Sequence, residues 1–298
     1  MSSSCLLCIV VLCYDEASEQ FARTKYNKEY TSQTEIVRLP SEGWLMENHF
    51  LLHNVCVGEN ERNEYKYNKY KYMGMISWRA KQKLSCLPSL QFIQEVMLTS
   101  SSAPDVLYFQ HAPWYPRLST VEASSRFHPH FKPLWIALLQ ELGYSEDVAL
   151  DKRIPFFMYN YWIATSSWIQ QYSEFLQRAV AVLQSWSSDP SHPLYAKLFS
   201  DSEYKGQLSV DVKQRLFQRP YYTYHPFLLE RLPGFFFWSK NADIVALSDP
   251  PRIVHRFVPE FHPHQYLQWN PDLRAKVKPH FAAHHFFYHG YREGRKFR

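Results

Sequence analysis

The chain has 298 residues, of which 46% are hydrophobic and 20% are charged. This composition excludes a disordered or collagen-like chain, and the length suits one large domain or a domain with an appendage. The net charge of +5 is concentrated towards the C-terminal end, and without a basic recognition helix we expect no nucleic-acid partner.

The amino-terminal segment is an apolar run that contains three of the five cysteines, Cys5, Cys8 and Cys13. An odd number of cysteines gathered in this way does not suit a disulfide framework, so we expect a reducing, cytoplasmic environment. The run is shorter than the roughly 20 residues that span a bilayer. We therefore expect no transmembrane segment, while peripheral contact with a membrane stays open.

The first half of the chain alternates strand and helix patterns. Residues 5–13 predict a buried strand, 16–28 a helix, 35–39 a short strand, 44–57 a helix, 59–71 a solvated insertion, and 72–78 a further strand. An amphipathic helix at 90–98 precedes a strand at 105–109, and a loop is expected at 112–125. This order predicts an α/β fold.

The second half is richer in helix. Residues 133–142 predict a helix between Pro133 and Gly143, 156–168 begin as a strand, and 168–186 carry the longest helical pattern. A polar loop at 187–206, a helix from Val210 and a buried segment at 220–238 follow. Pro250 and Pro251 indicate a turn into a helical tail, which divides the chain into a domain at 1–248 and a module at 249–298.

Several blocks between about residues 70 and 240 follow one another in a familiar order. The sequence YMGMISWRAKQK at 72–83, the strand at 105–109, His128-Pro129, NYWIA at 160–164 and PFLLERL at 226–232 resemble glycosyltransferase-like proteins of bacterial polysaccharide clusters and large viruses. The resemblance implies a GT-A-like fold, that of the nucleotide-diphospho-sugar transferases, with a mixed sheet flanked by helices.

The tail carries a second resemblance. YLQWNPDL at 266–273, with HG at 289–290 and REGR at 292–295, is similar to a two-helix module that often accompanies glycosyltransferase domains. Together the two resemblances imply a glycosyltransferase of polysaccharide or glycoprotein glycan synthesis. Its partners would be a nucleotide-sugar donor and a glycan acceptor.

Sugar transfer from a nucleotide requires cations that neutralise the leaving diphosphate. Arg79 and Lys83 follow a predicted strand and stand one helical turn apart, which makes them the candidates, with Ser77 and Trp78 beside them in the same block. The alternative is a pair of solvated surface cations.

The chain has no Asp-x-Asp triplet at the expected strand end, so Mn²⁺ or Mg²⁺ remains an open cofactor and we assign no metal ligands. Asp105 opens the predicted strand at 105–109. It is a candidate catalytic residue, although the surrounding serines and Pro104 also suit a loop cap.

Glu230 is the candidate general base, and Glu47 is the alternative. Arg231, beside Glu230, is a candidate substrate-binding residue. A structural role for Glu230 and Arg231, tying a helix to the core, is an equal alternative.

Three polar residues complete the predicted substrate site. Asn160 and Tyr161 are candidates for binding sugar hydroxyls, or are polar residues at the edge of the core. His128 is a candidate substrate-side donor or a packed loop residue.

The leading hypothesis is a glycosyltransferase. A non-catalytic glycan-binding or scaffold protein of the same fold is the alternative, since the metal-binding triplet is missing. A basic nucleic-acid binder that uses the tail is a third hypothesis.

Overall fold

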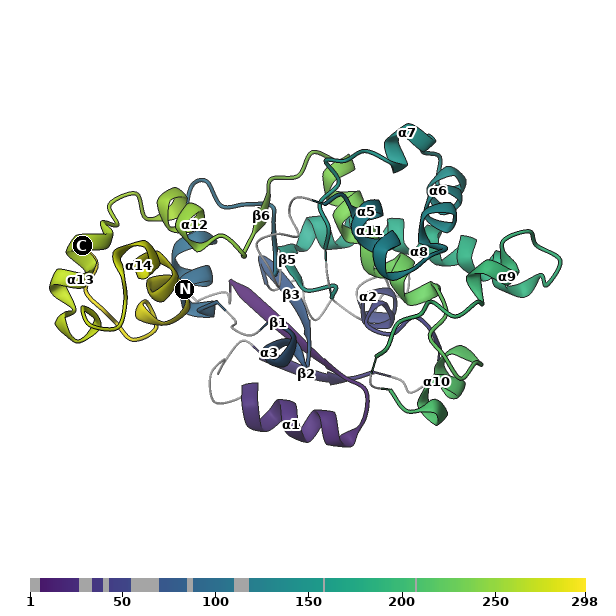
Figure 1. Cartoon of the computed structure of the whole chain (residues 1–298), viewed down its shortest axis with the longest axis horizontal. Coiled ribbons are helices and arrows are strands. Elements are labelled where there is room, and N and C mark those ends of the chain that lie inside the picture. The colour runs from purple at the N-terminus through teal and green to yellow at the C-terminus, as the bar shows by residue number, and fades with distance from the viewer. Residues whose placement is uncertain are drawn as a thin grey trace.

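The computed structural model describes residues 6–26, 34–39, 43–54, 70–84, 88–109, 118–157, 159–206 and 208–298. Its centre is a six-stranded sheet in the order β2-β1-β3-β5-β4-β6 (Figure 1). The strands are β1 (Leu7–Cys13), β2 (Thr34–Arg38), β3 (Tyr72–Ser77), β4 (Val106–Tyr108), β5 (Trp162–Thr165) and β6 (Ile244–Ala246). Only β5 runs antiparallel to its neighbours. The predicted α/β class, with a mixed sheet flanked by helices, is confirmed.

Helices surround this sheet (Figure 1). They are α1 (Glu16–Tyr26), α2 (Asn48–Asn54), α3 (Ala80–Lys83), α4 (Leu90–Phe92), α5 (Thr120–Phe127), α6 (Phe131–Glu141), α7 (Glu146–Ala149), α8 (Ser166–Ser188), α9 (Tyr195–Leu198), α10 (Val210–Phe217), α11 (His225–Ser239), α12 (Pro250–Phe257), α13 (Pro263–Trp269) and α14 (Ala282–His285). A π-helical turn, η1 (Ile93–Met97), continues α4, and the tail also contains the short turns η3 (Pro271–Leu273), η4 (Pro279–Phe281) and η5 (Phe286–Gly290).

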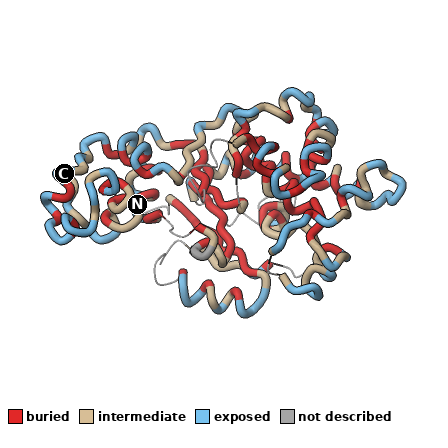
Figure 2. Tube along the Cα trace, in the orientation of Figure 1, coloured by how far each residue is buried: buried red, intermediate tan, exposed pale blue. Residues whose placement is uncertain are grey.

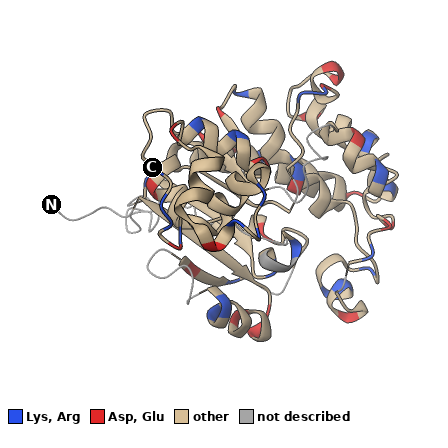
Figure 3. Cartoon of the chain, turned by 60° about the vertical axis from the view of Figure 1, so that its left-hand side comes forward, with Lys and Arg blue, Asp and Glu red and all other residues tan. Residues whose placement is uncertain are grey.

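The central strands are buried on both faces, as Figure 2 shows for the middle of the molecule. Successive side chains of a strand point to opposite faces. In β1, Val10 and Leu12 therefore enter one hydrophobic core while Ile9 and Val11 enter the other. β1 and β3 carry no charged residue, and the Lys, Arg, Asp and Glu side chains lie mainly on the surrounding helices and loops (Figure 3).

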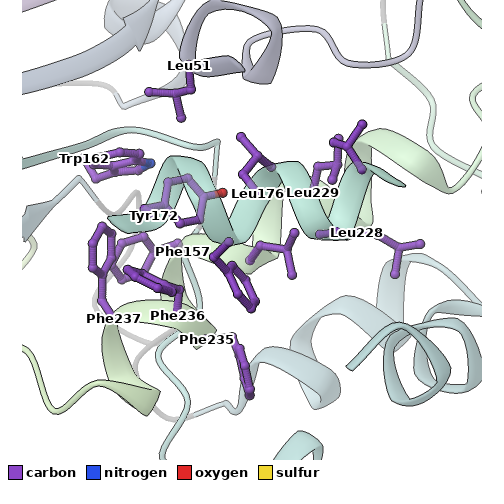
Figure 4. Packing of buried hydrophobic residues seen from close by; sticks show 14 of the residues in the cluster. Leu51, Phe157, Trp162, Tyr172, Leu176, Leu228, Leu229, Phe235, Phe236 and Phe237 are labelled. Carbon is purple, nitrogen blue, oxygen red and sulfur yellow. The ribbon is translucent and has the colours of Figure 1, made fainter. Parts of the chain in front are cut away.

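The first core is built mainly on the long helix α8 and on α11, which pack against each other (Figure 4). Tyr172 of α8 lies 5.8 Å from Phe237 of α11, measured between ring centroids, and Trp162 of β5 lies 5.4 Å from Phe237. The Trp162–Phe237 pair is edge-to-face, a geometry that is favourable in addition to the burial of apolar area. This core fixes α11 against the sheet.

The second core joins the C-terminal tail to the other face. Phe92 of α4 contacts Phe286 and Phe287 of η5, with ring centroids 5.8 and 5.3 Å apart. The backbone N–H of Ser89 donates to the carbonyl of Phe287 at 3.3 Å. The tail thus shares a hydrophobic core with the sheet domain, and the division near Ser248 stays a prediction.

Some predicted boundaries are wrong for local reasons. The expected loop at 112–125 ends early, because Ser119 and Glu122 form a capping box that starts α5 at Thr120. The turn into the tail lies at Leu247 and Ser248, and Pro250 and Pro251 begin α12, where a missing N–H costs no hydrogen bond. The strand expected from Phe156 begins only at Trp162.

The short strand β6 was not predicted from the sequence. The expected insertion at 59–71 lies mostly outside the residues that the structure describes. No helix in those ranges combines the length and the apolar character that crossing a bilayer requires.

Gly234 in α11 provides a test of this packing. A Cβ atom at this position would lie 2.3 Å from the carbonyl oxygen of Pro155, a backbone atom. Glycine to alanine in a helix normally stabilises by about 1 kcal/mol. Because of the clash, we expect Gly234→Ala to destabilise instead, by about 1–3 kcal/mol in urea unfolding.

The control is Gln184→Ala, at an exposed position of α8. It should change the unfolding free energy by less than about 0.5 kcal/mol. A neutral or stabilising Gly234→Ala would contradict the close approach of α11 to Pro155.

Candidate functional site

A cavity of about 270 Å³ lies at the carboxyl ends of β1 and β3. Tyr14, soon after β1, and Ser77 and Trp78, at the end of β3, line it. The chain passes from β1 to β2 on one side and later to β3 on the other side, so the strand order reverses at β1. Open α/β sheets bind ligands at such a switch point.

Most of the predicted site residues meet here. Of the ten predicted residues, the eight that line the cavity are Ser77, Trp78, Arg79, Lys83, His128, Asn160, Glu230 and Arg231. Glu47, the alternative general base, also lines it. Segments from five parts of the chain therefore converge on one cavity.

Tyr161 and Asp105 do not line the cavity. Tyr161 is buried, and its hydroxyl shares a short hydrogen bond with that of Ser77, so it supports the cavity wall from behind. Asp105 lies at the amino end of β4, where its carboxylate accepts the N–H of Asp243 at 2.8 Å. The cavity is at the opposite end of the parallel strands, and this placement corrects the prediction that Asp105 and Glu230 share a site.

The two predicted cations come from the turn that follows β3. The backbone N–H of Lys83 donates to the carbonyl of Arg79 at 3.0 Å, which places the two side chains one helical turn apart. The Lys83 ammonium lies 4.6 Å from the ring centroid of Tyr159 and 5.6 Å from that of Tyr161. It forms no ion pair with a carboxylate of the described residues. This cation can therefore meet an anionic ligand.

Glu230 is committed to structural contacts. Its carboxylate pairs with Arg231 at 2.8 Å and accepts a short hydrogen bond from the N–H of Tyr159. Burial by itself would raise the pKa of Glu230, but Arg231, Lys83 and these hydrogen bonds outweigh it and bring the pKa below the ordinary glutamate value. Glu230 thus lacks the raised pKa that suits a general base.

Glu47 has the opposite environment. It directly precedes α2, and it accepts a short hydrogen bond from the hydroxyl of Tyr14. Burial is the strongest influence and raises the pKa of Glu47, against the opposing effects of Lys83 and Tyr14. Of the two cavity carboxylates, Glu47 is therefore the one whose raised pKa suits it to accept a proton.

The loop before β5 is held in an uncommon backbone conformation. Tyr159 and Asn160 have φ angles of 68° and 55°, in the left-handed region. The Asn160 side chain accepts the indole N–H of Trp162 at 2.8 Å and donates to the Asn48 side chain at 3.4 Å. These bonds connect β5 to the start of α2. They hold the turn that carries Glu47.

Five aromatic side chains that line the cavity are called the aromatic wall: Phe127, His128, Tyr204, Tyr222 and Phe227. The rings of His128 and Phe227 lie 4.0 Å apart, between centroids. His128 Nδ1 lies 2.9 Å from the carbonyl oxygen of Ser202, which fixes the proton on Nδ1. Burial lowers the pKa of His128, so this ring is neutral at pH 7.

The described residues bring no group of three or more His, Cys, Asp and Glu side chains together as metal ligands. The two carboxylates of the cavity bond to Tyr14 and to Arg231. A role for Mn²⁺ or Mg²⁺ stays a prediction, and no step below depends on it.

Sequence reasoning missed most of the aromatic wall and Tyr14. Tyr14 had a readable signal, because it comes directly after a predicted buried strand and ligands bind at strand ends. Tyr204 and Tyr222 had no such signal, since they lie in loops that only the tertiary structure brings to the cavity.

Comparisons with models of protein families, with curated proteins and with solved structures find no match for this chain.

The two glutamates should affect stability in opposite directions. The pKa of Glu47 is higher in the folded than in the unfolded protein, so ionising Glu47 lowers the free energy of unfolding as the pH rises through the folded-state pKa. Glu47→Gln should therefore stabilise the protein at pH 7. The pKa of Glu230 is lower in the folded than in the unfolded protein, so its ionised carboxylate stabilises the fold at pH values above its unfolded-state pKa. This contribution is lost as the pH falls through the folded-state pKa. Glu230→Gln should therefore destabilise at pH 7, by about 1–3 kcal/mol.

The measurement is urea unfolding of both variants and the wild type at pH 4 and pH 7. The difference between the variants should shrink at pH 4, where glutamates are largely protonated in the unfolded chain. Equal effects of the two substitutions at pH 7 would show that their environments do not differ as described.

Proposed function

We propose that this protein is a GT-A-like glycosyltransferase that transfers a sugar from a nucleotide-sugar donor to a hydroxyl of a glycan. The observation that carries the proposal is one cavity, at the switch point of an α/β sheet, that combines cations, carboxylates and aromatic rings. Cations suit a diphosphate, carboxylates suit sugar hydroxyls, and aromatic rings suit the apolar faces of sugars and bases.

The cationic part of the cavity supports a diphosphate site. Arg79 and Lys83 follow β3 and line the cavity. The guanidinium carbon of Arg79 lies over the Trp78 ring, 5.6 Å from the ring centroid. A planar guanidinium binds two phosphate oxygens at once, while an ammonium provides a compact charge. Together they would stabilise the negative charge that develops on the departing nucleoside diphosphate.

The proposed transfer has a simple balance. The oxygen of the acceptor hydroxyl forms a bond to the anomeric carbon, and the bond from this carbon to the phosphate oxygen breaks. The bonding electrons leave with the nucleoside diphosphate, and the hydroxyl proton passes to the carboxylate of Glu47. Tyr14 keeps Glu47 oriented through its hydrogen bond.

Donor binding is the first test of this function. Isothermal calorimetry with UDP-, GDP- and dTDP-sugars, with and without Mn²⁺, should identify a donor that the wild type binds. Lys83→Ala should weaken that binding about ten- to hundredfold, because a charge-assisted contact to phosphate is lost.

Lys132→Ala is the matched control, since Lys132 is an exposed cation of α6 that does not line the cavity. It should leave donor affinity unchanged. If no donor of the panel binds or is hydrolysed, the proposed function is wrong.

Proton transfer is the second test. Glu47→Gln should lower the turnover number about 10²- to 10⁴-fold and leave donor affinity unchanged. The wild-type rate should rise with pH and reach a plateau. The midpoint of this rise should lie above the ordinary glutamate pKa, because burial raises the pKa of Glu47. Tyr14→Phe should move this midpoint further up, since the Tyr14 hydrogen bond lowers that pKa.

The variant Glu230→Gln separates a proton-accepting role from a structural one. Its pH profile should keep the wild-type midpoint, whatever the loss in rate. A midpoint that disappears in Glu230→Gln and persists in Glu47→Gln would reverse the two assignments.

A further inference from the structure

Two of the most exposed aromatic side chains face the cavity. Among the described residues, Phe127 and Tyr204 of the aromatic wall are 46% and 43% exposed. Burial of such rings is strongly favourable, so exposed aromatic clusters in a concave site often mark binding surfaces. The other exposed large apolar residues, Val210, Trp269 and Phe281, do not line the cavity.

The exposed ring of Tyr204 is fixed in place. It meets Tyr222 edge-on at 5.0 Å and Phe227 at 5.3 Å, between ring centroids. Gly206 makes this packing possible, because a Cβ there would lie 2.4 Å from Cε1 of Tyr204 and 2.6 Å from the Tyr222 hydroxyl. A ring that is already ordered loses little conformational entropy when a ligand covers it.

The aromatic wall faces the charged residues of the site. Burial raises the pKa of Tyr204, and Glu230, Arg79 and Glu47 also act on it electrostatically. Burial likewise raises the pKa of Tyr222 to about 12, and Arg79 and Glu47 again act on this phenol. Both phenols are neutral at pH 7. A ligand that lies on the wall therefore has Glu47 and Glu230 within electrostatic reach.

From this arrangement we infer that the aromatic wall is an acceptor subsite, which stacks the apolar face of a sugar ring and presents a ring hydroxyl to Glu47. A pyranose has an apolar C–H face for Phe127 and Tyr204 and hydroxyl donors at its edge for carboxylates. The rings of the wall are themselves neutral, so a diphosphate is better placed beside Arg79 and Lys83. The acceptor role rests on the proposed transferase function, while binding of the ring can be measured separately.

The test uses saturation-transfer NMR and titration of the full-length protein with maltotriose, chitotriose, mannotriose and galactotriose. We expect at least one trisaccharide to bind, with the strongest saturation on its ring C–H protons. Phe127→Ala and Tyr204→Ala should each weaken this binding about five- to tenfold. Tyr204→Phe should keep it, because the stacking ring remains.

Gly206→Ala gives an independent test, since the added methyl group must displace the Tyr204 ring or the Tyr222 hydroxyl. It should weaken trisaccharide binding as Tyr204→Ala does. Phe281→Ala is the matched control, because this ring is 52% exposed and lies outside the cavity. It should leave binding unchanged.

The outcomes separate this inference from the proposed function. Unchanged trisaccharide affinity in Phe127→Ala and Tyr204→Ala, or no binding of any trisaccharide to the wild type, would overturn the inference even if a nucleotide-sugar binds. Weakened binding of the nucleotide donor in these variants, with unchanged trisaccharide binding, would also overturn it and assign the wall to the nucleobase. Trisaccharide binding that depends on the wall, without any donor binding, would support the subsite and defeat the transferase.

Discussion

The site depends on the ion pair and hydrogen bonds of the buried Arg231 guanidinium. It is 4% exposed, and a cation so far from water is stable only when it is paired with a carboxylate and hydrogen-bonded. It pairs with Glu230, donates to the hydroxyl of Ser124 at 3.1 Å and to the carbonyl of Phe157 at 3.2 Å, and lies over the ring of Phe156. One side chain thus joins α11, α5 and the segment that leads to β5.

The same contact gives the two glutamates of the cavity different chemistry. The Glu230 carboxylate forms an ion pair with Arg231 and accepts a hydrogen bond from the backbone N–H of Tyr159, so it has a structural role in the cavity lining. Glu47 has a phenol as its hydrogen-bond partner and is affected most strongly by burial. The two carboxylates of this cavity thus have pKa values moved in opposite directions, and only Glu47 has the raised pKa that suits proton transfer.

The cavity also divides its binding surfaces between two parts of the chain. The cations come from the short turn after β3, whereas the aromatic wall comes from the end of α5 and from the segments around Tyr204 and α11. Asn160 fixes a third part of the cavity, since its amide joins Trp162 of β5 to Asn48 at the start of α2, next to Glu47. The left-handed backbone at Tyr159 and Asn160 is kept by these contacts, as is usual for strained residues at functional sites.

The sequence by itself determined the α/β class, the position of most strands and of several longer helices, and the charged residues that line the cavity. The class and the elements could be predicted because strand and helix periodicities are local. The site residues came from the blocks around Ser77, His128, Asn160 and Glu230, whose order resembles one family. The sequence could not rank Glu47 above Glu230 or remove Asp105 from the site. Those decisions belong to the tertiary structure, since the pKa of a carboxylate depends on burial and on partners distant in the chain, and since strand direction decides which end of the sheet a residue occupies.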